Sequence, residues 1–365
     1  MTPKESLKNL GYDDDVIVKI LEWNNKSLPE TLNYYIEKTF NYFIKKGYTK
    51  DEIIKMTKKL PTLFGYSEEN LNQKYQYFIK KGYTKDEIIK MTKTLPALFS
   101  YSEENLNQKY QYFINKGYTL EEIVKMTKKL PTLFGCSEEK LNNKYQYFIE
   151  KGYTLNEIKK MTKKLPALFS LNEESLNKKY QYFIQKGYTL EEVVKMTKTL
   201  PALSSYSEEN LNNKYQYFIE KGYTKDEIIK MTKTLPALFS LNEESLNKKY
   251  QYFIEKGYTL EGIIKMTKTF PALFCLSEEN IEEKLSFYND INLLFIAIND
   301  TKQLMQSVEL SYARYMYFKE HGITIDESNY IRLFYDNKKF SKQYGITKEE
   351  LLERYKYDDE KRKKL

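Results

Sequence analysis

The residues best suited to chemistry in this sequence are lysines that recur every 35 positions. Two of them lie three residues apart in each repeat, as Lys90 and Lys93 do. Cations repeated at a fixed interval suit the regularly spaced phosphates of a nucleic acid. Lysines near the C-terminal end of a helix also offset the helix dipole and keep a surface soluble, so this second interpretation stays open.

Stacking of the repeats in register would align these lysines into rows. The first lysine row contains Lys55, Lys90, Lys125, Lys160, Lys195, Lys230 and Lys265. The second lysine row contains Lys58, Lys93, Lys128, Lys163, Lys198, Lys233 and Lys268. A further lysine per repeat, such as Lys74, lies in the second half of the unit, and we interpret it as part of a solvent-exposed face.

The repeats differ from one another mainly around a recurring proline and at the start of the segment that follows it. Two residues before the proline stand Lys59, Lys129 and Lys164, with threonine in the other repeats. The fourth residue of the next segment is asparagine, lysine or serine, depending on the repeat. The residues at this position that we predict to contact a nucleic acid are Asn70, Asn105, Lys140 and Asn210. Such variation could tune contacts with successive nucleotides, or it could be drift at exposed positions after duplication. Arg314, one of only four arginines, completes the predicted nucleic-acid contacts.

The inventory of reactive residues argues against an enzyme. His321 is the only histidine, and Cys136 and Cys275 are the only cysteines. There is no Cys/His cluster for zinc, no glycine-rich phosphate loop and no Ser-His-Asp set. We therefore expect no catalytic residues, no metal site, no cofactor and no small-molecule substrate. Two cysteines in so long a chain fit a reducing compartment, and we expect no disulfide between them.

The elements that must position the lysines repeat with the same period. Glycines recur at Gly47, Gly82, Gly117, Gly152, Gly187, Gly222 and Gly257. Prolines recur in step at Pro61, Pro96, Pro131, Pro166, Pro201, Pro236 and Pro271. Near-identity at a fixed period of this size is typical of stacked-repeat proteins.

Each unit contains its own start and stop signals. Thr84 and Glu87 form a capping box that begins a helix. Pro96 ends this helix and opens a short apolar turn, and Ser102 caps a second helix. Gly117 ends the second helix in a left-handed conformation. The buried face of the second helix should contain Leu106, Tyr110, Phe113 and Ile114, and we expect the abundant tyrosines, such as Tyr77, to pack between repeats.

These patterns predict an all-α protein. We expect a right- or left-handed superhelical α-solenoid of about nine 35-residue helix–Pro-turn–helix repeats. Residues 1–46 would form a degenerate N-terminal cap, 47–291 seven near-identical repeats, and 292–365 degenerate C-terminal repeats and a cap.

The repeat resembles that of the mitochondrial transcription termination factor (mTERF) family. The resemblance rests on the string KGYTxxEIIKMTKxLPALFSYSEENLNxKYQYF and spans residues 10–355. It also includes Ser307 to Gly322 and Phe340 to Tyr355, which are similar to the C-terminal end of that family. It implies a curved superhelix of three-helix units with a basic concave groove. It further implies nucleic-acid binding, usually to duplex DNA and sometimes to RNA or ribosomes.

The net charge of +8 and the pI of about 8.9 are compatible with a polyanionic partner. We expect a monomer that binds nucleic acid, with duplex DNA favoured over RNA, and that regulates or terminates transcription. The alternatives are RNA or ribosome binding by the same groove, and a protein-binding scaffold. The longest apolar run, 293–298, is far too short for a membrane span, so we expect no membrane partner. The N-terminal residues predict a cytoplasmic or nucleoid-associated protein, organellar only if a presequence was removed.

Overall fold

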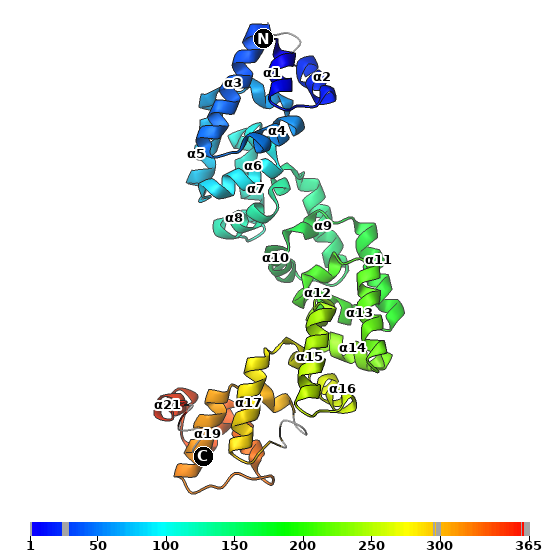
Figure 1. Ribbon diagram of the computed structural model, residues 1–365, viewed down its shortest axis with the longest axis vertical. Helices are drawn as coiled ribbons and strands as arrows, with labels where there is room; N and C mark the ends of the chain where they lie inside the picture. The colour runs from blue at the N-terminus through cyan, green and yellow to red at the C-terminus, as the bar shows by residue number, and fades with distance from the viewer. Residues whose placement is uncertain (1, 24–28, 295, 297–300, 359, 361–365) are drawn as a thin grey trace. The chain divides into compact units, whose positions relative to one another are not determined.

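A computed structural model describes residues 2–23, 29–294, 296, 301–358 and 360. The chain divides into two compact units, Met1–Lys178 and Lys179–Leu365. Each is built from the same alternation of an α-helix, a one-turn 3₁₀ helix and a second α-helix (Figure 1). Within the described ranges all regular elements are helical, which confirms the predicted all-α repeat fold.

In the first unit, three helices precede the regular repeats: α1 (Pro3–Asn9), α2 (Asp14–Trp23) and α3 (Pro29–Lys46). The regular repeats follow as α4 (Lys50–Lys59), η1 (Pro61–Gly65), α5 (Glu68–Lys80), α6 (Lys85–Thr94), η2 (Pro96–Phe99), α7 (Glu103–Asn115), α8 (Leu120–Lys129), η3 (Pro131–Gly135), α9 (Glu138–Glu150), α10 (Leu155–Lys164) and η4 (Pro166–Phe169). The next helix is α11 (Glu173–Lys186).

The second unit continues the alternation through α17 and then departs from it. Its regular elements are α12 (Leu190–Thr199), η5 (Pro201–Ser204), α13 (Glu208–Glu220), α14 (Lys225–Thr234), η6 (Pro236–Phe239), α15 (Glu243–Glu255), α16 (Leu260–Thr269), η7 (Pro271–Cys275) and α17 (Glu278–Asp290). The C-terminal elements are η8 (Thr301–Met305), α19 (Val308–Glu320), η9 (Tyr330–Phe334), α20 (Asn337–Tyr344) and α21 (Lys348–Arg354).

The start signals in the sequence act as expected. Thr84 caps α6 by accepting a hydrogen bond from the backbone N–H of Glu87, whose carboxylate accepts one from the N–H of Thr84. Ser102 caps α7 through a single bond, which its side chain accepts from the backbone N–H of Asn105. Each cap pairs a backbone donor that the helix itself leaves unsatisfied, which contributes about 1 kcal/mol to helix stability.

The predicted proline turn is a buried 3₁₀ turn. In η2, Pro96 occupies the first position, where its missing N–H leaves no hydrogen bond unmade. Leu98 and Phe99 point inward and are 0% and 4% exposed. The turn thus joins two helices and also supplies part of the core between them.

The expected left-handed ends of the second helices are also present. Gly117 has a φ of +86°, a backbone conformation that glycine adopts without steric cost. Where the sequence replaces this glycine with Asn292, the residue keeps a positive φ of 59°. Asparagine tolerates that conformation better than most residues, so the turn survives the substitution.

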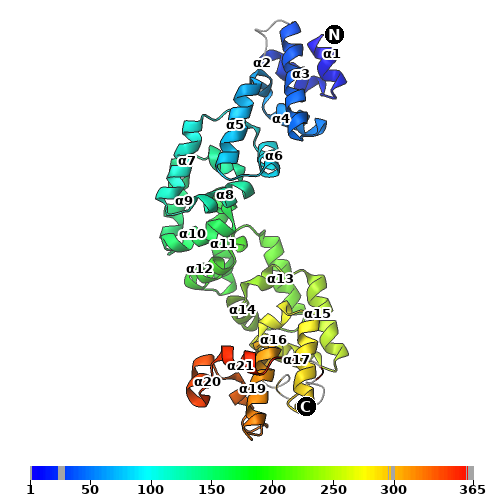
Figure 2. The same ribbon diagram turned by 90° about the vertical axis from the view of Figure 1, so that its left-hand side faces the viewer.

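The first helices of successive repeats stack on one another. In the first unit α4, α6, α8 and α10 are in contact in that order, and in the second unit α12, α14 and α16 are (Figures 1 and 2). Buried tyrosine–threonine hydrogen bonds fix the register. The hydroxyl groups of Tyr83 and Thr127 are 2.5 Å apart, and those of Tyr118 and Thr162 are 2.6 Å apart.

Aromatic rings fill the space between repeats. Phe113 of α7 is fully buried and packs edge-on against Tyr118 and in a tilted arrangement against Phe169, with ring centroids 5.6 and 5.9 Å apart. Tyr77 is buried between repeats and donates to the side-chain oxygen of Asn107 at 2.9 Å, which confirms its predicted packing. The prediction that Ile114 lies on the buried face was wrong, because this side chain is 44% exposed at the last turn of α7.

Candidate nucleic-acid interface

The first lysine row lies on the exposed side of the first helices. All seven of its side chains are exposed. In each helix the neighbouring apolar residues, such as Ile88 and Met91 in α6, are buried in the core, and the lysine of the first row points away from them. Stacking of the first helices places Lys55, Lys90, Lys125 and Lys160 on successive helices of the first unit. Lys195, Lys230 and Lys265 are arranged likewise in the second unit.

Most lysines of the first row have an acidic residue four positions earlier on the same helix. Lys125 makes an ion pair of 2.6 Å with Glu121, and both side chains are exposed. Lys125 is also the one member of this row with an ion pair within the described ranges. The exception in sequence is Lys160, because the residue four positions before it is Asn156. Lys160 therefore lacks the carboxylate that the other lysines of this row have four residues earlier.

The second lysine row is engaged in ion pairs between repeats. Lys93 of α6 contacts the carboxylate of Glu52 in α4 at 2.5 Å, and the same contact recurs at 2.6–2.7 Å in later repeats. The described pairs are Lys93–Glu52, Lys128–Glu87, Lys163–Glu122, Lys233–Glu192 and Lys268–Glu227, and Lys58 contacts Asp13 in the same manner. Lys198 is half-buried at the corresponding position of α12. These lysines connect the end of one first helix to the start of the preceding one.

Each glutamate in these pairs has two roles. One oxygen of Glu52 accepts from Lys93, and the other accepts from the backbone N–H of Thr49 as part of the capping box. Both contacts stabilise the charged form, so the pKa of Glu52 is lowered, first by the lysine. A phosphate would have to compete with this carboxylate for the ammonium group. The structure therefore distinguishes the exposed lysines of the first row from the ion-paired lysines of the second row. Their spacing in the sequence gives no sign of this difference.

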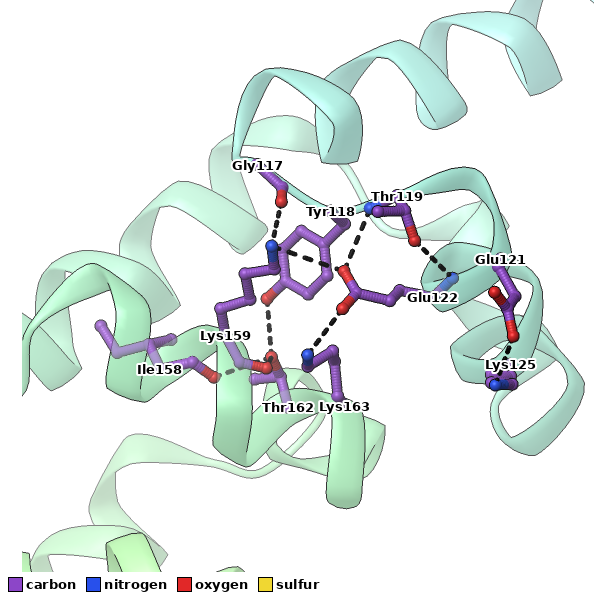
Figure 3. A network of polar contacts seen from close by, with 10 residues as sticks. All are labelled: Gly117, Tyr118, Thr119, Glu121, Glu122, Lys125, Ile158, Lys159, Thr162 and Lys163. Atoms are coloured by element: carbon purple, nitrogen blue, oxygen red, sulfur yellow. Dashed lines mark hydrogen bonds and ion pairs between the residues drawn. The ribbon is translucent and has the colours of Figure 1, made fainter.

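The pair around Glu122 carries an additional cation (Figure 3). Lys163 contacts one carboxylate oxygen at 2.6 Å, and Lys159 contacts the other at 3.4 Å. Lys159 also donates to the carbonyl of Gly117. In the neighbouring repeats an apolar residue such as Ile89 stands at this position. Hydrogen bonding from Lys163, with both lysine charges nearby, lowers the pKa of Glu122 to about 2.

The lysines that precede the prolines are exposed and lie at helix C-termini. Lys59 donates to the carbonyls of Lys93 and Thr94 at 3.4 and 3.3 Å. Lys129 donates to the carbonyl of Lys164 at 3.4 Å, and the side chain of Lys164 is exposed. These lysines therefore help to satisfy the last carbonyls of the next first helix, as expected for cations at that end of a helix.

The variable residues of the second helices are exposed but occupy the first helical turn. The backbone N–H groups of Asn70, Asn105, Lys140 and Asn210 donate to the capping serine at 3.1–3.2 Å, and their side chains point to solvent. Among the described residues, no hydrogen bond or ion pair joins them to the first lysine row. Their place beside that row stays a prediction.

Arg314 is buried and bonded to backbone carbonyls of the C-terminal segment. It is 1% exposed, and its guanidinium donates to the carbonyls of Leu333 and Tyr335 at 2.8 and 2.7 Å. It also lies over the ring of Phe340, 4.4 Å from the centroid, and burial lowers its pKa to about 10. A side chain enclosed in this way has no access to a phosphate backbone, so Arg314 is not part of the interface proposed below.

The sequence profile of one family, mTERF, matches three overlapping stretches, residues 1–126, 115–222 and 191–292. The chain belongs to the mTERF family. No curated protein matches the sequence. Membership confirms the resemblance found in the repeat and indicates a nucleic-acid-binding repeat protein.

In this mTERF chain the structure corrects the prediction for the lysines of the second helices. The prediction of a solvent-exposed face was wrong, because five of the six lysines are only 5–8% exposed and the sixth, Lys179, is half-buried. The five are Lys74, Lys109, Lys144, Lys214 and Lys249, and Lys284 of α17 is buried in the same way. Burial lowers the pKa of most of them, as for Lys109, which donates to the carbonyl of Cys136 in the next repeat. One sequence signal could have found them: they precede Tyr or Leu within the apolar stripe.

A further set of lysines packs between tyrosines of successive mTERF repeats. Lys81 follows α5, and its Nζ lies 5.4 Å from the ring centroid of Tyr77 and 4.9 Å from that of Tyr110. Lys46, Lys116, Lys186 and Lys221 repeat this arrangement. Cation–π contacts of this kind contribute about 0.5–1 kcal/mol each at partly exposed sites. Most lysines of the repeat are thus used in stacking, and the first row is the main exception.

Cys136 and Cys275 are free thiols, and burial raises the pKa of both. In the part of the chain that the structure describes, no group of three or more His, Cys, Asp or Glu side chains is placed to hold a metal ion. None of the described helices is long and apolar enough to cross a membrane.

Proposed function

We propose that the protein binds duplex DNA, as a monomer, mainly through the first lysine row of residues 1–178, and that it acts by blocking or guiding transcription. One observation carries the proposal: the first row is exposed on stacked helices, whereas the second row is held by carboxylates of the preceding repeat. A phosphate can therefore contact the ammonium groups of the first row without first breaking ion pairs between repeats.

The residue type supports contact with the backbone of the nucleic acid. Lysine is a flexible point charge that suits phosphates, and it is a poorer reader of base edges than arginine. Contacts of this kind position a protein on DNA and give affinity with little sequence preference. Whatever preference exists would come from Asn70, Asn105, Lys140 and Asn210, together with the lysines that precede the prolines.

The salt dependence of binding tests the proposal. If the four lysines of the first row in residues 1–178 each neutralise a phosphate, log K should fall against log salt with a slope of about −3.6. The affinity for random-sequence duplex DNA should then drop about 100-fold between 50 and 200 mM salt. Fluorescence polarisation at several salt concentrations measures both quantities, and a salt-independent affinity would rule out this interface.

A matched pair of variants locates the contact. Lys90→Gln removes a cation of the first row, and Lys85→Gln removes an exposed cation from a different side of the same helix. Five residues along an α-helix correspond to a rotation of about 140°, so only one of the two can face a given backbone. We expect Lys90→Gln to reduce the slope by about 0.9 and Lys85→Gln to leave it unchanged.

Competition distinguishes the partners. Duplex RNA or single-stranded RNA that displaces duplex DNA at lower concentration would identify RNA as the ligand of the same surface. The absence of binding to all nucleic acids at low salt would favour a protein partner.

A further inference from the structure

Each first helix has three exposed positions at intervals of four residues, which we call its outer stripe. In α4 the outer stripe consists of residues 51, 55 and 59, and the later first helices have the equivalent residues at steps of 35. Residues four apart lie on the same side of an α-helix, one turn from each other. The middle position is always the lysine of the first row, and the residues on either side of it differ between repeats.

The charge of the outer stripe is unevenly distributed along the chain. Its net charge is +1 in α4 and α8, +2 in α10, and 0 in α6, α12, α14 and α16. In α10 the stripe is Asn156, Lys160 and Lys164, with an amide where each of the other first helices has a carboxylate. Helices α8 and α10 therefore have the highest combined charge of any two successive first helices, +3.

Four exposed lysines provide this charge, and we call them the α8–α10 patch. The patch consists of Lys125, Lys129, Lys160 and Lys164. The two helices are in contact, and the Nζ atom of Lys129 lies 3.4 Å from the carbonyl oxygen of Lys164 at the end of α10. The patch is therefore one continuous surface that lies within the first unit.

The carboxylates at the start of α8 leave this surface basic. Glu121 contacts Lys125 at 2.6 Å, and both side chains are exposed to solvent. An ion pair of this kind contributes little free energy, so a phosphate can replace the carboxylate. Glu122 is directed elsewhere: Figure 3 shows it in contact with Lys159 and Lys163, apart from Lys125 and Glu121.

The other repeats show that the patch is not a general property of the fold. Four first helices have threonine at the third position of the outer stripe, and its hydroxyl donates to the carbonyl four residues earlier on the same helix, as Thr94 does to Lys90 at 3.0 Å. The same bond is present for Thr199, Thr234 and Thr269 at 2.9–3.1 Å. Each of these stripes offers a partner one lysine beside one carboxylate.

We propose that the α8–α10 patch anchors the nucleic acid, with Lys129 and Lys164 as positioning residues in addition to the first lysine row. Ammonium groups distributed over two neighbouring helices suit the successive phosphates of one strand. Contacts to phosphates fix the place and the orientation of a protein on a duplex. The inference rests on the proposed function and deepens it, because it states which two repeats hold the duplex most tightly.

The test removes the two added lysines together from the full chain. A duplex of about 12 base pairs is titrated by fluorescence polarisation at several salt concentrations. In the variant Lys129→Gln/Lys164→Gln, the slope of log K against log salt should become less steep by about 1.8, because two phosphates are no longer neutralised. The affinity at about 100 mM salt should fall more than about tenfold.

A matched control removes the same charge from outside the outer stripe. Lys50 and Lys85 are exposed at the starts of α4 and α6, five residues before a lysine of the first row. The variant Lys50→Gln/Lys85→Gln should leave the slope unchanged, and circular dichroism establishes that both double variants are folded. Equal losses in the two double variants would overturn the inference, because total charge alone would then decide affinity. An unchanged slope in Lys129→Gln/Lys164→Gln would also overturn it.

A transplanted patch provides the converse test. In the second unit, Thr199→Lys, Asp226→Asn and Thr234→Lys give α12 and α14 the same outer-stripe charges that α8 and α10 have. Introduced into the chain that carries Lys129→Gln and Lys164→Gln, these changes should recover the lost affinity for the short duplex. An affinity that stays low would show that the charge of the outer stripe does not create an anchor.

The results also separate this inference from the proposed function. Salt-dependent duplex binding that Lys90→Gln weakens but Lys129→Gln/Lys164→Gln leaves intact would retain the first lysine row and reject the anchor. The absence of salt-dependent duplex binding by the unaltered chain would reject both.

Discussion

The two units of the chain share an interior but differ in surface charge. Residues 1–178 contain 30 Lys and Arg against 23 Asp and Glu, a net charge of +7, whereas residues 179–365 contain 29 against 28, a net charge of +1. The buried positions of the two units are nearly identical in kind, as shown by Phe113 and Phe218. The two units therefore share the side chains that stack repeats and differ in the balance of basic and acidic residues.

The largest effect should come from the shared interior. Phe113→Ala in the first unit and Phe218→Ala in the second should each reduce the free energy of unfolding by about 3–5 kcal/mol, because both leave a cavity between repeats. Chemical denaturation followed by circular dichroism measures the loss. Ile114→Ala, at an exposed position beside Phe113, should change it by less than about 0.5 kcal/mol. If Phe218→Ala left the free energy of unfolding almost unchanged, the interiors of the two units would not be equivalent.

The next effect concerns binding and should distinguish the units. Replacing Lys90, Lys125 and Lys160 together by Gln should weaken duplex binding by more than about tenfold at moderate salt. The matched replacement of Lys195, Lys230 and Lys265 removes the same charge from the less basic unit, and we expect less than about a threefold loss. Polarisation titrations at one salt concentration compare the two. Equal losses would mean that the net charge of each unit does not decide where DNA binds.

A smaller effect concerns stability against pH. The pKa of Glu122 is lowered to about 2 from an ordinary value of 4.5, so its ion pairs stabilise the fold above about pH 4.5. This contribution should be lost as the pH falls from about 4.5 toward 2, since the unfolded state binds the proton first. Glu122→Gln should cost about 1 kcal/mol at pH 7 and almost nothing at pH 2.

Glu192 provides the comparison in the second unit, because the described contacts give it Lys233 as its one lysine partner. Lys159→Ile removes the second lysine from Glu122 and restores the residue type of Ile89 and Ile229. In the Lys159→Ile variant, the loss of stability caused by Glu122→Gln should then equal the loss caused by Glu192→Gln. Melting temperatures measured between pH 2 and 7 compare the two losses. A pH profile that Lys159→Ile leaves unchanged would assign no stabilising role to the additional cation.

The smallest effect concerns the acid one turn before each lysine of the first row. Asn156→Asp gives Lys160 the neighbour that Lys90 has in Asp86, and Asp86→Asn makes the opposite change. A pair at this spacing contributes a few tenths of a kcal/mol, so duplex affinity should fall about twofold in the first variant and rise about twofold in the second. Parallel polarisation titrations measure both, and changes of the same sign would reject the role of these acids.

The sequence by itself determined the helical repeat in detail. Thr84, Glu87, Pro96, Ser102 and Gly117 act through the backbone of their own repeat, so their roles follow from local stereochemistry. The period of 35 residues then required that units stack. For the same reason the family could be identified from the repeat alone, before any contact between repeats was known.

Only the tertiary structure decided which lysines are available to a partner. Lys90 and Lys93 are three residues apart on one helix, yet Lys93 reaches a glutamate 41 residues earlier and Lys90 remains exposed. Lys74 and Lys109 lie within the apolar stripe of their helices, and the packing of the next repeat shows that these charged side chains are buried. A lysine side chain is long enough to reach a neighbouring unit, so its environment depends on how the repeats pack against each other. Spacing along a single helix contains no information about that packing.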